Sequence, residues 1–86
     1  MAFPLRIEVS QAGRKSLKKL SPQVRVRVLR KLARYNEKPE LLALNIKNLV
    51  DANPPQFRLR VGDYRAVGTV DGDKLLLHVF VDRKDL

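Results

Sequence analysis

The sequence of 86 residues contains no cysteine and a single histidine, His78. Without cysteine there is no disulfide, no thiolate metal ligand and no cysteine nucleophile, and this composition fits a reducing cytoplasm. One histidine leaves little material for a multi-histidine metal site or a catalytic triad. We therefore expect a cytoplasmic protein that needs neither a cofactor nor a metal.

Long apolar runs are also missing. The first ten residues, MAFPLRIEVS, include Arg6 and Glu8, and no window approaches the ~20 apolar residues that a membrane-spanning helix needs. A chain of this length is too short for two independent cores. We expect one domain over residues 1–86, neither exported nor inserted in a membrane.

Acidic residues are scarce in the first part of the chain. Residues 1–38 hold eleven Lys and Arg against two Glu, whereas residues 39–86 hold seven residues of each sign. The net charge of +9 therefore resides in the N-terminal part. Such asymmetry is typical of a surface that binds a polyanion or an acidic protein. Solubility alone would explain the charge but not its placement.

The N-terminal part is predicted to form a strand and two helices. Residues 5–9 alternate between apolar and charged, which is the period of a half-buried strand. A short basic helix over 11–19 follows, with Gly13 as a weak point, and a second helix begins at Pro22 and ends near Asn36. Each helix is preceded by a serine that can cap it.

The second helix has two distinct faces at 100° per residue. Its core face consists of Val24, Val28, Leu32 and Tyr35. Its basic face consists of Arg27, Arg30, Lys31, Arg34 and Lys38.

In the remainder of the chain, apolar residues recur with a period of two. Residues 40–55 form a connector with a turn of helix around 41–44, and strands are expected at 56–61, 64–70 and 74–81. Gly-Asp and Asp-Gly turns join these strands into an antiparallel meander. The predicted fold is a two-layer α+β domain of order βααβββ, with the helices on one face of the sheet.

Three arginines gather around the first turn of this meander. Arg58 and Arg60 share the face of their strand that the apolar residues leave open, and the register decides whether Arg65 joins them. Guanidinium groups match phosphate oxygens, so the cluster suggests binding of a phosphate backbone. A solvated sheet face with pairs to Asp63 or Asp51 remains the alternative.

Phosphate binding allows RNA cleavage without a metal, because the RNA 2′-hydroxyl can act as the nucleophile. A two-metal nuclease is disfavoured, since Asp71 and Asp73 occupy a tight turn where aspartate serves the backbone. By alternation His78 shares a face with Leu76 and Phe80. It is either a general base or, more commonly for such a residue, a hydrogen-bonded structural histidine.

Three segments resemble the RelE/ParE toxin superfamily of toxin–antitoxin modules. They are FRLRVGDYR at 57–65, Lys47-Asn48-Leu49, and the ending DRKDL at 82–86. The compact ending is similar to the RelE branch, whose members cleave mRNA in the ribosomal A site, whereas the ParE branch poisons DNA gyrase. The resemblance implies a RelE-like fold over nearly the whole chain.

The resemblance also implies roles for individual residues. Arg58, Arg65 and Arg83 match positions that clamp the scissile phosphate and stabilise its added charge. Lys47 and Arg60 match positions that are usually basic, and we expect them, with Lys84, to contact the RNA backbone. The cations of the second helix, Arg27, Arg30, Lys31 and Arg34, are expected RNA contacts as well.

The sequence departs from the RelE pattern at four points. Relatives carry a histidine where this sequence has Asp82, a lysine where it has Gln56, and a large apolar residue where it has Gly68. They also carry a tyrosine at the position that would follow Leu86, where this sequence stops. An attenuated or inactive toxin homologue, or a ParE-like gyrase inhibitor without nuclease chemistry, therefore remains as an alternative.

The resemblance implies two kinds of partner. The targets are the ribosome and its mRNA, which attract a basic protein. The other partner is a cognate antitoxin with an acidic, partly disordered segment that folds on binding and covers the active face in a hetero-oligomer.

Overall fold

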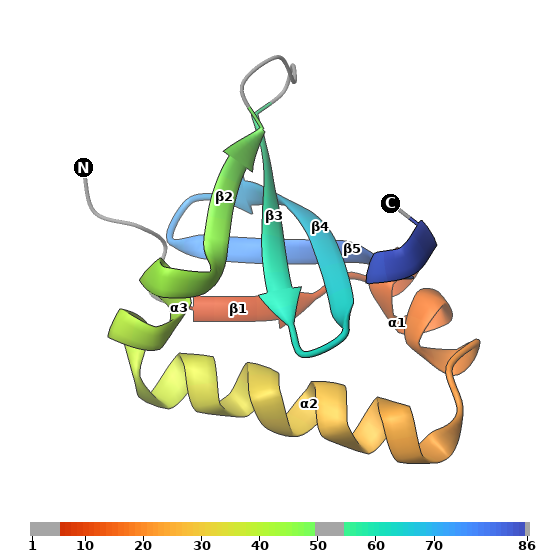
Figure 1. Ribbon diagram of the computed structural model, residues 1–86. Coiled ribbons are helices and arrows are strands. Elements are labelled where there is room, and N and C mark those ends of the chain that lie inside the picture. The colour runs from red at the N-terminus through yellow and green to blue at the C-terminus, as the bar shows by residue number, and fades with distance from the viewer. Residues whose placement is uncertain (1–5, 50–54, 86) are drawn as a thin grey trace.

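The structure is a computed structural model that describes residues 6–49 and 55–85. Three helices and a five-stranded sheet follow one another along the chain (Figure 1). The elements are β1 (Arg6–Val9), α1 (Gln11–Lys18), α2 (Pro22–Glu37), α3 (Pro39–Asn45), β2 (Ile46–Leu49), β3 (Gln56–Val61), β4 (Tyr64–Asp71), β5 (Lys74–Asp82) and the 3₁₀ helix η1 (Arg83–Asp85). No helix in this part of the chain is both long and apolar enough to cross a membrane.

The sheet has the strand order β1-β5-β4-β3-β2. Strands β2 to β5 are antiparallel neighbours, and β1 pairs with β5 in parallel at the far edge. The predicted α+β class, the first strand and the three-stranded meander are confirmed. The predicted order βααβββ is incomplete, because residues 39–49 of the expected connector form α3 and the edge strand β2.

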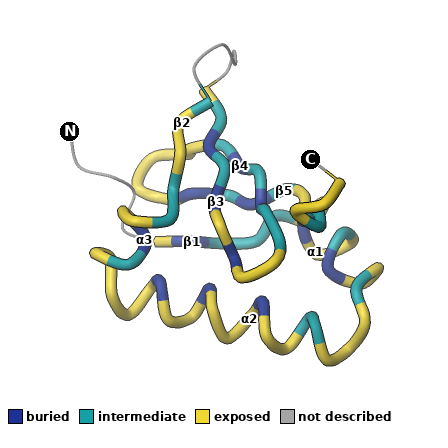
Figure 2. The backbone as a smooth tube through the Cα atoms, viewed as in Figure 1, coloured by how far each residue is buried: buried dark blue, intermediate teal, exposed yellow. Residues whose placement is uncertain are grey.

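The two longer helices begin where the sequence predicts. Ser10 and Ser21 cap α1 and α2, and each side chain accepts a hydrogen bond from the backbone N–H three residues on. The buried residues of α2 lie on its side toward the sheet, Val24 and Arg25 are half-buried, and the rest of that helix is exposed (Figure 2). They join Leu17 of α1 and Leu42 of α3 in one core against β3, β4 and β5. The predicted core face of α2 is therefore confirmed.

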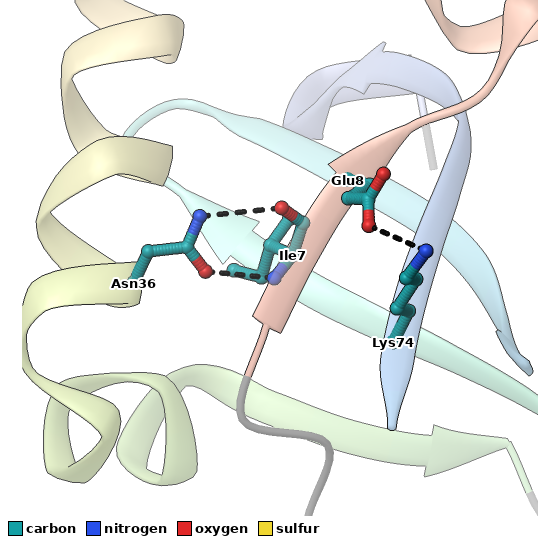
Figure 3. Close-up of polar contacts among 4 residues, drawn as sticks. All are labelled: Ile7, Glu8, Asn36 and Lys74. Atoms are coloured by element: carbon teal, nitrogen blue, oxygen red, sulfur yellow. Dashed lines mark hydrogen bonds and ion pairs between the residues drawn. The ribbon is translucent and has the colours of Figure 1, made fainter. Parts of the chain in front are cut away.

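A side chain of α2 covers the outer edge of β1. Asn36 Oδ1 accepts a hydrogen bond from the Ile7 N–H at 2.7 Å, and Asn36 Nδ2 donates to the Ile7 carbonyl at 3.2 Å (Figure 3). The amide thereby makes the two bonds that a neighbouring strand would make, which protects this edge from pairing with another chain. Beside it, Lys74 of β5 forms an ion pair with Glu8 at 3.2 Å.

A bulge between β4 and β5 changes the direction of one side chain. Val67 pairs with Val79 but Gly68 pairs with Leu77, so His78 is the extra residue on β5. Phe80 is consequently buried in the core, and the prediction that it shares a face with His78 is wrong. Gly68 has no room for a side chain at this point, because a Cβ there would clash with the carbonyl oxygen of Leu76.

Candidate functional site

Four cations lie on the sheet face that the helices leave open. The register places Lys47 of β2 opposite Arg58 of β3, and Arg60 of β3 opposite Arg65 of β4. Directly opposite residues of antiparallel strands share a face, with Cβ atoms about 4.5–5.5 Å apart, and residues two apart on one strand are about 7 Å apart. Arg65 therefore joins the predicted cluster, and β2 adds Lys47 to it.

These four side chains line one hollow of about 310 Å³. The other lining residues come from the end of α3 and the start of β2: Leu44, Asn45 and Ile46. None of the seven is acidic, and the ion pair found within residues 6–49 and 55–85 is that of Lys74 with Glu8. Asp63 forms no ion pair with an arginine within the described residues, so that alternative is wrong. Asp51, the other expected partner, lies outside the described residues.

The guanidinium of Arg58 is incompletely satisfied. Its Nε is buried and has no hydrogen-bond partner within the described residues. A buried polar group without a partner costs about 1–3 kcal/mol, and more if it is charged. The Nε–H of Arg58 is thus a donor without a partner, on a side chain that lines the hollow.

The other two arginines of the hollow are held through the backbone. Arg65 Nη1 donates to the carbonyl oxygens of Gly62 at 3.1 Å and Tyr64 at 3.0 Å, which fixes one side of its guanidinium against the turn. The hydroxyl of Tyr35 on α2 donates to the Arg60 carbonyl at 2.7 Å. Burial raises the pKa of the Tyr35 phenol, and the charge of Arg60 partly opposes this rise.

Arg83 and Lys84 lie in η1, beyond the end of β5. The backbone N–H of Arg83 donates to the Asp63 carbonyl at 3.0 Å, so η1 is attached to the same turn that holds Arg65. Asp82 accepts from the Lys84 N–H at 3.1 Å and thereby caps η1. Both cations are exposed, and neither lines the hollow of Lys47, Arg58, Arg60 and Arg65.

The cations of α2 lie outside this hollow. Arg27, Arg30, Lys31 and Arg34 are all exposed, as predicted for the basic face of that helix. Lys31 and Arg34 reach a neighbouring hollow of about 270 Å³ that Arg60 also lines.

His78 has no part in the hollow. Its Nε2 lies 2.8 Å from the Thr69 hydroxyl and its Nδ1 lies 2.8 Å from the Ser10 hydroxyl. The interpretation as a hydrogen-bonded structural histidine is confirmed. Within the described residues, no three His, Asp or Glu side chains come together in a way that could hold a metal ion.

Sequence reasoning missed the contribution of α3. Leu44 is 81 % exposed beside the arginines, and Asn45 is fixed by donating from Nδ2 to the Leu41 carbonyl at 2.7 Å. The Lys38-Pro39 step and the apolar residues after it gave the signal for a short helix. Its position beside the sheet depends on long-range packing, which periodicity does not reveal.

The architecture and this sheet face define a class: a small two-layer α+β domain with a cationic hollow on its open face. Neither a family model nor a curated protein matches the sequence. Solved structures do match it. A chain of the RelBE2 toxin–antitoxin complex of Mycobacterium tuberculosis is similar with a TM-score of 0.70 and 20 % identity, over 93 % of this chain and 99 % of that one.

Two archaeal complexes give the same result. A chain of the RelB–RelE antitoxin–toxin complex of Methanococcus jannaschii has a TM-score of 0.65 and 23 % identity, over 90 % of this chain and 91 % of its own. A chain of the RelE–RelB complex of Pyrococcus horikoshii OT3 has a TM-score of 0.66 and 19 % identity, over the full length of both. The protein therefore has the RelE-like fold that the residues at 57–65 predicted.

Proposed function

We propose that this protein is the toxin of a toxin–antitoxin module and acts as a metal-independent, ribosome-dependent mRNA endoribonuclease. The observation that carries this proposal is the hollow in which Lys47, Arg58, Arg60 and Arg65 converge without an acidic neighbour. Four cations that face one another without counter-ions repel, and an anion between them removes that repulsion. RNA offers such an anion in a chemically reactive form.

The reaction uses the RNA as its own nucleophile. The 2′-oxygen forms a bond to the adjacent phosphorus and loses its proton, while the bond from phosphorus to the 5′-oxygen breaks and that oxygen gains a proton. Charge develops on the phosphoryl oxygens in the transition state, where positioned guanidinium groups stabilise it most. Arg58 and Arg65 are proposed for this role, with Arg83 closing over the phosphate from the neighbouring η1 and Lys84 contacting the RNA backbone.

The donor that Arg58 leaves unsatisfied supports this assignment. The buried Nε–H of Arg58 has no partner within the described residues, so a phosphate oxygen that reached it would supply a hydrogen bond that the free protein lacks. Arg65 is held on one side by two carbonyls, so it loses little side-chain entropy on binding. Lys47 and Arg60 are proposed to contact the flanking backbone.

The partners that we propose are inferred from the same cationic hollow. The similar structures are complexes of RelE with RelB antitoxins. We propose a cognate antitoxin with an acidic segment that covers the cationic hollow, and the ribosome with its mRNA as the target. The charge asymmetry of the chain supports both, because each partner is a polyanion.

The decisive experiment is cleavage of mRNA on programmed ribosomes kept in Mg²⁺, with protein that has been treated with EDTA and desalted. The expected result is cleavage in the A site by the treated protein, loss of cleavage with Arg65→Ala, and full cleavage with Lys15→Ala, a matched loss of charge on α1. No cleavage by the wild type, or loss of activity after EDTA treatment, would contradict the proposal.

One observation favours a second candidate, a gyrase poison that performs no chemistry. The seven residues that line the hollow include no histidine, tyrosine or carboxylate that could act as a general base. Supercoiling by purified gyrase in the presence of the protein tests this candidate. Inhibition of supercoiling without mRNA cleavage would replace the first proposal, and undisturbed supercoiling removes the second.

A further inference from the structure

A second cationic hollow adjoins the first and shares two residues with it. This hollow of about 270 Å³ lies where the end of β3 reaches α2, and Figure 1 shows β3 directed toward that helix. It is lined by Lys31, Arg34, Tyr35, Leu41, Asn45, Arg60 and Gly62. Arg60 and Asn45 line both hollows, so the two are continuous at these residues.

Arg60 is fixed at the junction. Its carbonyl accepts the 2.7 Å hydrogen bond from Tyr35, whose ring is buried in the core at 3 % exposure. The backbone of β3 at this point is therefore tied to the same helix that carries Lys31 and Arg34. The backbone positions that carry the cations on the two sides of the junction are therefore held relative to each other.

We infer that the hollow of Lys31, Arg34 and Arg60 is a second phosphate subsite, which holds the RNA backbone next to the phosphate bound in the first hollow. This inference rests on the proposed function, in which the first hollow takes an RNA phosphate. An RNA strand repeats its charge at every nucleotide, so a strand held in one hollow presents another phosphate to the adjacent one. Arg60 contacts both phosphates and sets the path of the strand toward α2.

Two features favour RNA over an acidic protein segment as the occupant. The cations continue from the first hollow without an acidic residue among the lining residues of either. Arg60 lines both hollows, so a strand that carries a charge at every nucleotide meets a cation in each of them. A single strand with evenly spaced phosphates fits a row of cations.

Only two of the four α2 cations belong to this subsite. Lys31 and Arg34 line the hollow with Arg60, whereas Arg27 and Arg30 do not. Arg14 and Lys15 of α1 are exposed as well and line neither hollow, so they provide a control pair with the same loss of charge, again one lysine and one arginine.

The test measures binding of non-cleavable 2′-O-methyl oligoribonucleotides, a dinucleotide with one phosphate and a decanucleotide, by fluorescence anisotropy over a range of salt. Single-stranded binding falls with salt with a slope of about −0.7 for each phosphate neutralised. For the decanucleotide, K31Q/R34Q should reduce the magnitude of the slope by about 0.7, the share of one phosphate. For the dinucleotide it should have little effect, and the control R14Q/K15Q should change neither slope as much.

Several outcomes overturn the inference. Equal losses in the two double variants would reduce it to a general charge effect. An affinity that does not increase with RNA length would remove the second subsite. A selective loss of polyglutamate binding by K31Q/R34Q, with RNA binding unchanged, would assign the surface to an acidic protein. Cleavage on programmed ribosomes is measured separately, so failure of the subsite and failure of the nuclease proposal are distinguishable.

Discussion

Asn36→Ala tests whether a single amide closes the edge of the sheet. Asn36 is exposed, so its replacement removes little packing but deletes both hydrogen bonds to Ile7, which lie at 2.7 and 3.2 Å. Each is worth about 0.5–1.5 kcal/mol net, which gives an expected loss of about 1–3 kcal/mol in the free energy of unfolding. Urea unfolding followed by circular dichroism measures this loss, with an unchanged m-value.

Asn36→Asp sharpens the same test. A carboxylate still accepts from the Ile7 N–H, but its second oxygen faces the Ile7 carbonyl, so the charged form is disfavoured in the folded state. The pKa of this aspartate is then raised above its unfolded value of about 3.9, and the folded state binds the proton more tightly. The free energy of unfolding of Asn36→Asp, relative to that of Asn36→Ala, should therefore increase as the pH falls from the raised pKa to about 3.9. The reason is that the protonated carboxyl group can donate to the Ile7 carbonyl.

The control is Glu37→Ala, the next residue on the same exposed turn, which should change stability by no more than about 0.5 kcal/mol. If Asn36→Ala were as mild as this control, the amide would not be holding the strand. If Asn36→Asp showed no gain over Asn36→Ala at low pH, the assignment of Nδ2 as donor to Ile7 would be refuted.

Three further predictions concern the sheet faces, the Arg60 anchor and the packing of α1. Arg65→Ala should abolish the toxicity that the proposed function implies in a protein that stays folded, with a loss of about 1–3 kcal/mol for its two hydrogen bonds to the turn. Leu59→Ala, at 0 % exposure, should cost about 2–5 kcal/mol, and a milder effect than that of Arg65→Ala would show that the faces of β3 are misassigned. Tyr35→Phe should cost about 1 kcal/mol at neutral pH. Because burial raises the Tyr35 pKa above 10.0, the wild type binds this proton more tightly when folded and loses stability as the pH rises above that value. The phenylalanine variant should lack this part of the alkaline decline in thermal melts, and identical declines would contradict it. Gly13→Ala should destabilise by about 1–3 kcal/mol, since a Cβ there would clash with a carbonyl oxygen of β5, whereas helix propensity alone would give a gain of about 1 kcal/mol; a more stable variant would refute the close packing.

The cationic hollow joins local and long-range features of the chain. Arg58 and Arg60 share a face because they are two residues apart on one strand, and the alternation of β3 makes this predictable. To place Arg65 on the same face, one must know the register across the turn, which pairs Arg65 with Arg60. The position of Lys47 opposite Arg58 could not be predicted, because no period in the sequence indicates the edge strand β2. Only the pairing of β2 with β3 in the folded sheet shows it.

The local elements and their faces follow from short-range features of the sequence. A serine before each long helix, the alternation in β3 and the apolar stripe of α2 act over a few residues, and each is encoded by its neighbours along the chain. Tertiary structure decided which elements meet: the parallel pairing of β1 with β5, the bulge at His78, and the place of Arg60 between two hollows. The physical reason is that periodicity gives the direction of a side chain but not its partner. Partners are chosen by packing and hydrogen bonding between segments far apart in sequence, as Asn36 and Tyr35 show by reaching from α2 to β1 and β3.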